Sequence, residues 1–105
     1  MKQLSNAAQA QFFEEIKRNP LYIKMPFEAA NFNRTTFSVY LWYILPIYIC
    51  GYDSFYFDNH MAAKVSNVSL NSVSTAKQTL IAAGLIEKGD AANVFKFVNK
   101  EESSC

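Results

Sequence analysis

Apolar positions recur along the chain at spacings that predict four helices and three short strands. Over residues 5–18, apolar side chains three or four positions apart predict a first helix, with glutamate, lysine and arginine on its solvent-exposed side. Ser5 or Asn6 can cap its start. Residues 21–26 follow as a short extended segment, because Pro26 disfavours helix immediately before it.

The longest uncharged stretch, TTFSVYLWYILPIYICGY, begins at Thr35. A membrane-spanning helix needs about 20 mainly apolar residues. This stretch is shorter, and it is interrupted by Pro46 and ended by Gly51, so no membrane contact is expected. We predict instead a core helix over residues 35–50, capped by Thr35 or Thr36 and kinked or divided at Pro46. The side chains expected to pack together are Val39, Trp42, Tyr43, Pro46 and Ile47 on this helix and Met61, Val65, Val73 and Leu80 beyond it.

The second half of the chain predicts a strand, a helix pair and a hairpin. Residues 54–57 alternate and are rich in aromatic side chains, which indicates a strand. The chain then turns helical, with a polar turn at Asn67, a residue type that tolerates the left-handed conformation, before a last helix that starts at Ser69. Two strands at 85–88 and 94–100 close the fold, and glycine, aspartate and asparagine between them suit a hairpin tip.

Length and composition favour one domain. The chain has 105 residues, of which 50% are hydrophobic and 15% aromatic, enough for a packed core. We expect a single domain over residues 1–100, with an N-terminal helix at 5–18, a core at 35–100 and a frayed tail at 101–105. The first twenty residues lack the apolar region of a signal peptide and the chain has two cysteines, so a cytoplasmic location is expected.

The last predicted helix carries a motif of a known family. Ser69 at its cap is followed by Val73 and then by Leu80, and Gly-Leu-Ile at residues 84–86 closes it. The two apolar residues share one helical face, and the glycine supplies the left-handed turn that ends the helix. Together with the element order, this motif resembles the winged helix-turn-helix family. The resemblance implies an α+β fold with a three-helix core, a short strand and a C-terminal β-hairpin wing, to which residues 5–18 add a helix.

Proteins of this family bind double-stranded DNA with the last helix in the major groove, so its exposed side chains are the candidate site. Asn71 and Gln78 can pair with adenine, hydroxyl groups can bond phosphates or bases, and Lys77 can pair with a phosphate. The alternative is that these residues only solvate an exposed face. The candidates on the recognition helix are Ser69, Asn71, Ser72, Ser74, Thr75, Lys77 and Gln78, and those on the wing are Lys88, Asn93, Lys96 and Lys100.

Charge supports a polyanionic partner only weakly. The net charge is +1, but residues 60–100 carry five lysines against Glu87 and Asp90. The recognition helix has no arginine, the residue that most often reads guanine. Either an A·T-rich site is read by Asn71, Gln78 and DNA shape, or the wing lysines dominate.

A homodimer, or tandem binding of several copies to repeated sites, is expected, because one copy would contact DNA too weakly for specificity at physiological salt. The chain has more aromatic residues than a minimal winged helix requires, including Phe12 and Phe13 on the N-terminal helix. These residues either form the dimer interface or complete the monomer core.

Catalysis is not expected. His60 is the sole histidine, and nothing marks Cys50 or Cys105 as its nucleophilic partner. The sequence contains no CxxC, no HExxH and no glycine-rich phosphate loop, so neither a metal nor a cofactor is predicted.

The segment YIKMP followed by TTFSVYLWYIL is similar to the start of plasmid and phage replication-initiator winged helices. We therefore expect a protein that binds a repeated or A·T-rich site on a plasmid or phage. It would organise a nucleoprotein complex in replication, partition or the conjugation relaxosome. The alternatives are a transcriptional repressor and a winged helix used as a protein–protein interaction module.

Overall fold

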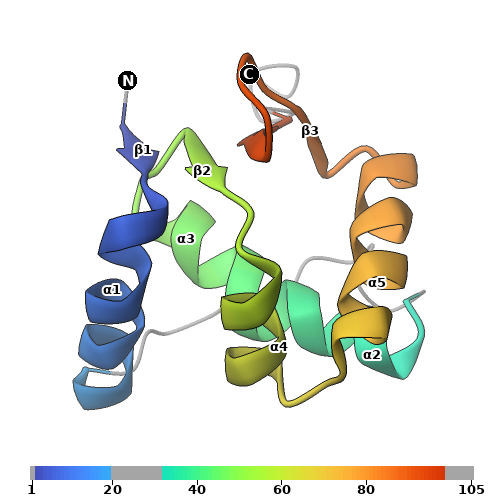
Figure 1. Cartoon of the computed structure of the whole chain (residues 1–105), viewed down its shortest axis with the longest axis horizontal. Coiled ribbons are helices and arrows are strands. Elements are labelled where there is room, and N and C mark those ends of the chain that lie inside the picture. Colours follow the sequence, from blue (N-terminus) through green and yellow to red (C-terminus); the bar gives the residue numbers. More distant parts are fainter. Residues whose placement is uncertain (1, 20–31, 99–105) are drawn as a thin grey trace, which may run out of the picture.

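The computed structural model describes residues 2–19 and 32–98 (Figure 1). The expected segment at 21–26, Lys100 and the tail at 101–105 lie outside the described residues. The α+β class is confirmed, since helices pack on a four-stranded sheet. In chain order the elements are β1 (Gln3–Leu4), α1 (Asn6–Arg18), α2 (Arg34–Val39), the π-helix η2 (Tyr40–Ile44), α3 (Leu45–Ile49), β2 (Ser54–Tyr56), α4 (Asn59–Ser66), α5 (Leu70–Ala82), β3 (Ile86–Lys88) and β4 (Val94–Phe97).

The sheet has the strand order β1-β2-β4-β3, in which only β1 and β2 run parallel. Figure 1 shows the strands above the helices, with α1 and α5 at opposite sides of the molecule. Leu4, Phe55 and Phe95 are paired across β1, β2 and β4, and all three are buried. Leu4 lies in β1, a strand that the sequence did not predict, because a two-residue strand has no periodicity of its own.

The uncharged stretch forms three short helical pieces in one continuous run. Asn33, and not Thr35 or Thr36, caps its start, because the Asn33 carboxamide accepts the backbone N–H of Thr36 at 2.9 Å. The predicted irregularity at Pro46 takes the form of the π-turn η2, where the Leu45 N–H bonds to the carbonyl of Tyr40. Proline has no N–H and its ring clashes with the carbonyl four residues earlier, so a widened turn before it accommodates the ring.

The π-turn changes which side chains face the core. Val39, Tyr43 and Ile47 are buried as predicted, and so is Pro46. The prediction for Trp42 is wrong, because 53% of its surface is exposed. A π-turn uses more residues than an α-turn, so the 3.6-residue spacing that assigned Trp42 to the core does not hold across it.

The core is built around the ring of Tyr43, which is fully buried. Phe13 of α1 stacks on it at 5.6 Å between ring centres, and Phe55 and Phe57 contact it from the β2 segment. Its hydroxyl donates to Gln9 Oε1 at 2.8 Å and accepts the N–H of Asp58 at 2.9 Å. These contacts connect α1 to the chain segment between β2 and α4.

We predict that Tyr43→Phe lowers the free energy of unfolding by about 1–3 kcal/mol, because it leaves the buried Gln9 Oε1 and the Asp58 N–H without their partner. Urea unfolding followed by circular dichroism measures the change. Tyr52→Phe is the matched control, since the half-buried Tyr52 ring packs on Phe12 through contacts that do not use its hydroxyl. Equal stability losses in the two variants would contradict the role given to the Tyr43 hydroxyl.

Candidate nucleic-acid interface

In the helix pair α4–α5, a side chain caps the N-terminus of each helix. Asp58 accepts the N–H of Met61 at 3.1 Å and begins α4. Ser69 accepts the N–H of Ser72 at 3.2 Å and begins α5, as predicted. Between them Asn67 adopts the left-handed conformation, with φ 57° and ψ 48°, which confirms the turn expected there.

One side of α5 is fully buried. Val73, Ala76 and Leu80 have no exposed surface, and neither does Ala62 of α4. Alanine at this crossing allows the two helices to approach closely. After α5, Gly84 takes φ 77°, and the N–H of Leu85 bonds to the carbonyl of Leu80 at 3.1 Å, which ends the helix before β3.

The opposite side of α5 presents uncharged polar side chains to solvent. Its exposed candidates are Asn71, Ser74, Thr75 and Gln78, which we call the neutral face of α5. Asn71, Ser74 and Gln78 follow one another at helical spacing and therefore lie along one line of the helix. The structure thus brings the two carboxamides expected to read bases onto one exposed surface.

Ser69 and Ser72 have a different local role. The Ser69 hydroxyl caps the helix and also lies 3.0 Å from the Ser72 hydroxyl. Thr75 bonds back to the carbonyl of Asn71 at 3.4 Å. These three hydroxyl groups are engaged with the helix itself, so Asn71, Ser74 and Gln78 retain the most hydrogen-bonding capacity toward a partner.

Lys77 departs from the predicted solvent face. It is half-buried on the flank of α5, and its Nζ lies 4.5 Å from the centre of the Phe57 ring and 5.5 Å from that of Phe95. Burial lowers the pKa of this lysine. The ring faces attract the ammonium group, so Lys77 connects α5 to the sheet as well as carrying charge near the candidate interface.

The hairpin that follows α5 carries the remaining candidates. Gly89 begins its loop, where an added Cβ would lie 2.9 Å from the carbonyl oxygen of Val94. Asn93 ends the loop in the left-handed conformation with φ 64°. Lys88 is exposed, whereas exposed Lys96 forms an ion pair with Glu87 at 3.4 Å, which balances part of its charge.

The described residues supply little for other kinds of site. Within residues 2–19 and 32–98, no three His, Cys, Asp or Glu side chains come together as a metal site would require. Over the same ranges, every helix is too short or too polar to cross a membrane. His60 is exposed, and Cys50 is a half-buried free thiol.

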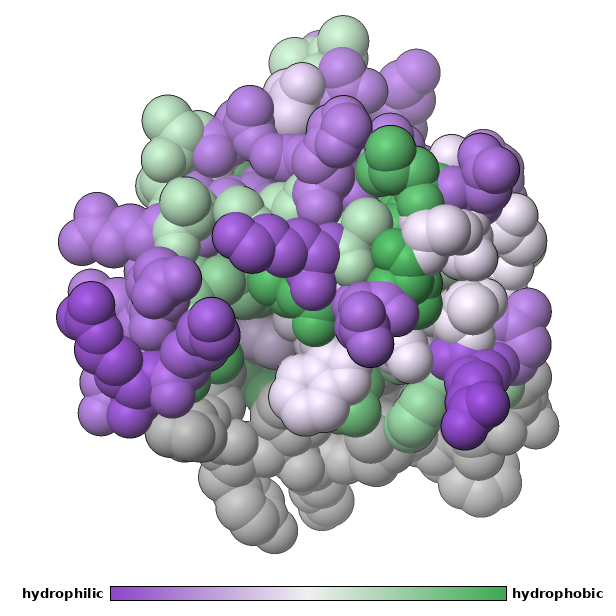
Figure 2. Space-filling model, turned by 60° about the horizontal axis from the view of Figure 1, so that its bottom comes forward, coloured by the Kyte–Doolittle hydropathy of each residue, from purple (hydrophilic) through white to green (hydrophobic). Residues whose placement is uncertain are grey.

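A groove between α1, η2 and α4 was not predicted from the sequence. Its most exposed aromatic residue is Trp42, which the periodicity had assigned to the core. Pro46 inside the helical pattern was the one signal that this periodicity would fail. The space-filling view in Figure 2 shows hydrophobic side chains reaching the surface between hydrophilic ones.

Comparison of the chain with models of protein families, with curated proteins and with solved structures finds no match.

We predict that Asn67→Ala lowers the free energy of unfolding by about 1–2 kcal/mol, because a Cβ-bearing residue without a polar side chain disfavours the left-handed conformation. Asn67→Gly should leave stability within about 0.5 kcal/mol of the parent chain, since glycine adopts this conformation without steric cost. Thermal or urea unfolding of both variants tests this pair. Equal losses for alanine and glycine would mean that the backbone conformation of Asn67 does not limit the turn.

Proposed function

We propose that this chain is a winged helix-turn-helix protein that binds double-stranded DNA in a sequence-specific manner. The order of α2–α3, β2, α4, α5 and the β3–β4 hairpin supports this, together with the pairing of β4 between β2 and β3. The observation that carries the proposal is the neutral face of α5, which opposes a fully buried face and precedes a hairpin with exposed lysines.

The neutral face is suited to reading bases. A major groove about 12 Å wide admits an α-helix, and a carboxamide can make two hydrogen bonds to adenine. Asn71 and Gln78 are seven positions apart, which corresponds to about 10 Å of helix, or about three base-pair steps. With Ser74 between them, α5 would favour a short A·T-containing site.

The hairpin is suited to holding the phosphate backbone. Lys88 is exposed, and Lys96 would exchange its partner Glu87 for a phosphate. An exposed ion pair contributes only about 0–1 kcal/mol, so this exchange costs little. Lys77 on the flank of α5 carries a third positive charge between helix and hairpin.

For the biological role we propose a homodimer on a repeated plasmid or phage site that organises a nucleoprotein complex in conjugation, partition or replication. Repression of transcription is compatible with the same contacts. One observation favours a second function, the use of this domain to bind a protein partner: the exposed side of α5 carries no charge.

The DNA proposal is tested in two steps. Duplexes that the unmodified chain binds are first selected from a random pool, and the affinity of each variant for them is then measured by fluorescence anisotropy. Lys88→Ala/Lys96→Ala should weaken binding to all duplexes and make the salt dependence shallower by about two units of slope. Asn71→Ala/Gln78→Ala should cost about 1–3 kcal/mol per lost base contact on the selected duplex and little on a scrambled one.

Two pairs on α1 serve as controls. Lys17→Ala/Arg18→Ala removes the same charge from exposed positions outside the proposed interface, and Asn6→Ala/Gln11→Ala removes the same polar groups. Neither pair should change which duplex is selected. The affinity for that duplex should change only by the small, sequence-independent effect of removing two positive charges in the lysine–arginine pair. If the parent chain binds no duplex even at low salt, the protein-partner function is favoured instead.

A further inference from the structure

The groove between α1, η2–α3 and α4 has a volume of about 480 Å³. Ile16 of α1, Trp42 and Pro46 of the central helical run, and Met61 and Val65 of α4 give it an apolar lining. Pockets for small molecules are mostly apolar, contain a few polar groups and measure roughly 300–1,000 Å³. The size and lining of this groove are therefore those of a small-molecule site.

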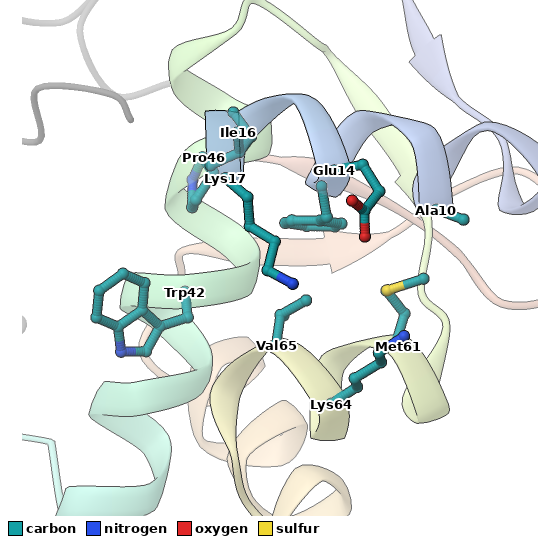
Figure 3. Close-up of a pocket in the computed structure, with 10 residues that line it drawn as sticks. Ala10, Glu14, Ile16, Lys17, Trp42, Pro46, Met61, Lys64 and Val65 are labelled. Carbon is teal, nitrogen blue, oxygen red and sulfur yellow. The ribbon is translucent and has the colours of Figure 1, made fainter. Parts of the chain in front are cut away.

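The polar groups of the groove are charged. Figure 3 shows Lys17 and Glu14 extending from α1 toward α4, with Met61 and Val65 reaching from α4. Lys64 adds a second ammonium group from α4. The one ion pair found among residues 2–19 and 32–98 is Lys96–Glu87, so neither lysine of the groove has an acidic partner within ion-pair distance there.

Two positive charges and one negative charge leave the groove with an excess of one positive charge. A ligand with a single negative charge would neutralise this excess, and its apolar part would cover Met61, Val65 and the exposed ring of Trp42. The apolar wall alone would accept many ligands. The lysines select among them, because a carboxylate is favoured over a hydroxyl or a cation beside an ammonium group.

We propose that this groove binds a small amphiphilic carboxylate, with the carboxylate between Lys17 and Lys64 and an aliphatic or aromatic body against the apolar lining. The site does not depend on DNA binding. Trp42 is the only tryptophan of the chain and lies at the groove, so its fluorescence reports occupancy directly.

Titration of the full chain with decanoate and decyltrimethylammonium below their micelle concentrations, and with 1-decanol below its solubility limit, tests the proposal. These probes share a ten-carbon tail and differ in head-group charge. Decanoate should shift the Trp42 emission to shorter wavelength in a saturable manner and bind about twofold to fivefold more tightly than decanol, because both lysines are exposed. The cationic probe should bind more weakly than decanol.

Two sets of variants identify the site. Lys17→Gln/Lys64→Gln should remove the preference for decanoate over decanol, whereas the matched pair Lys88→Gln/Lys96→Gln should keep it. Ala10→Leu, at an exposed position that lines the groove, should weaken both decanoate and decanol by filling the space. Far-ultraviolet circular dichroism and thermal unfolding of each variant confirm that the fold is retained.

Three outcomes would overturn the proposal. The first is the absence of a saturable emission change with decanoate, and the second is equal affinity for the three probes. The third is an emission that shifts with protein concentration alone, with dimers in sedimentation equilibrium that decanoate does not disrupt. That result would mean that a second copy of the chain occupies the groove.

Discussion

The hydroxyl group of Tyr43 is the point at which the N-terminal helix, the central helical run and the β2–α4 segment meet. Burying a hydroxyl group costs free energy unless the group is hydrogen-bonded, and this one is bonded to Gln9 on one side and to the Asp58 N–H on the other. Gln9 is itself fully buried, and its amide donates to the carbonyl of Tyr56. Burial raises the pKa of Tyr43, so the hydroxyl remains protonated and keeps its donor.

The helix pair is built outward from this network. Asp58 donates its N–H to Tyr43 and with its carboxylate caps α4, so the start of α4 is held directly against the core. The neighbouring Phe57 ring packs on Tyr43 and also lies beneath the ammonium group of Lys77. The orientation of α5 is thus connected to the Tyr43 network through two consecutive residues, Phe57 and Asp58.

Features that depend on local chemistry could be predicted from the sequence. Ser69 at a helix start, Asn67 in a left-handed turn and the α5 face of Val73 and Leu80 each follow from side-chain properties within a few residues. The exposure of Asn71 and Gln78 follows from the same periodicity. These predictions hold because neighbouring residues alone determine the local geometry.

Features that depend on distant partners could not be predicted in this way. Gln9 is polar, yet it is fully buried, because Tyr43, 34 positions away, supplies a hydrogen-bond partner for its side chain. β1 exists only through its pairing with β2. The exposure of Trp42 follows from a π-turn whose form, unlike the presence of Pro46, is not encoded in hydrophobic periodicity.

Under the proposed function, different residues supply sequence recognition and electrostatic affinity for DNA. The neutral face of α5 can form hydrogen bonds to bases but supplies no attraction to phosphate. That attraction comes from Lys77, Lys88 and Lys96, one of which is half-buried and one paired with an acidic residue. Affinity falls with salt by about 0.9 logarithmic units per phosphate contact, and few contacts give weak binding at physiological salt. Two or more copies on adjacent repeats would add their contacts together, which is why a repeated site suits this domain better than a single one.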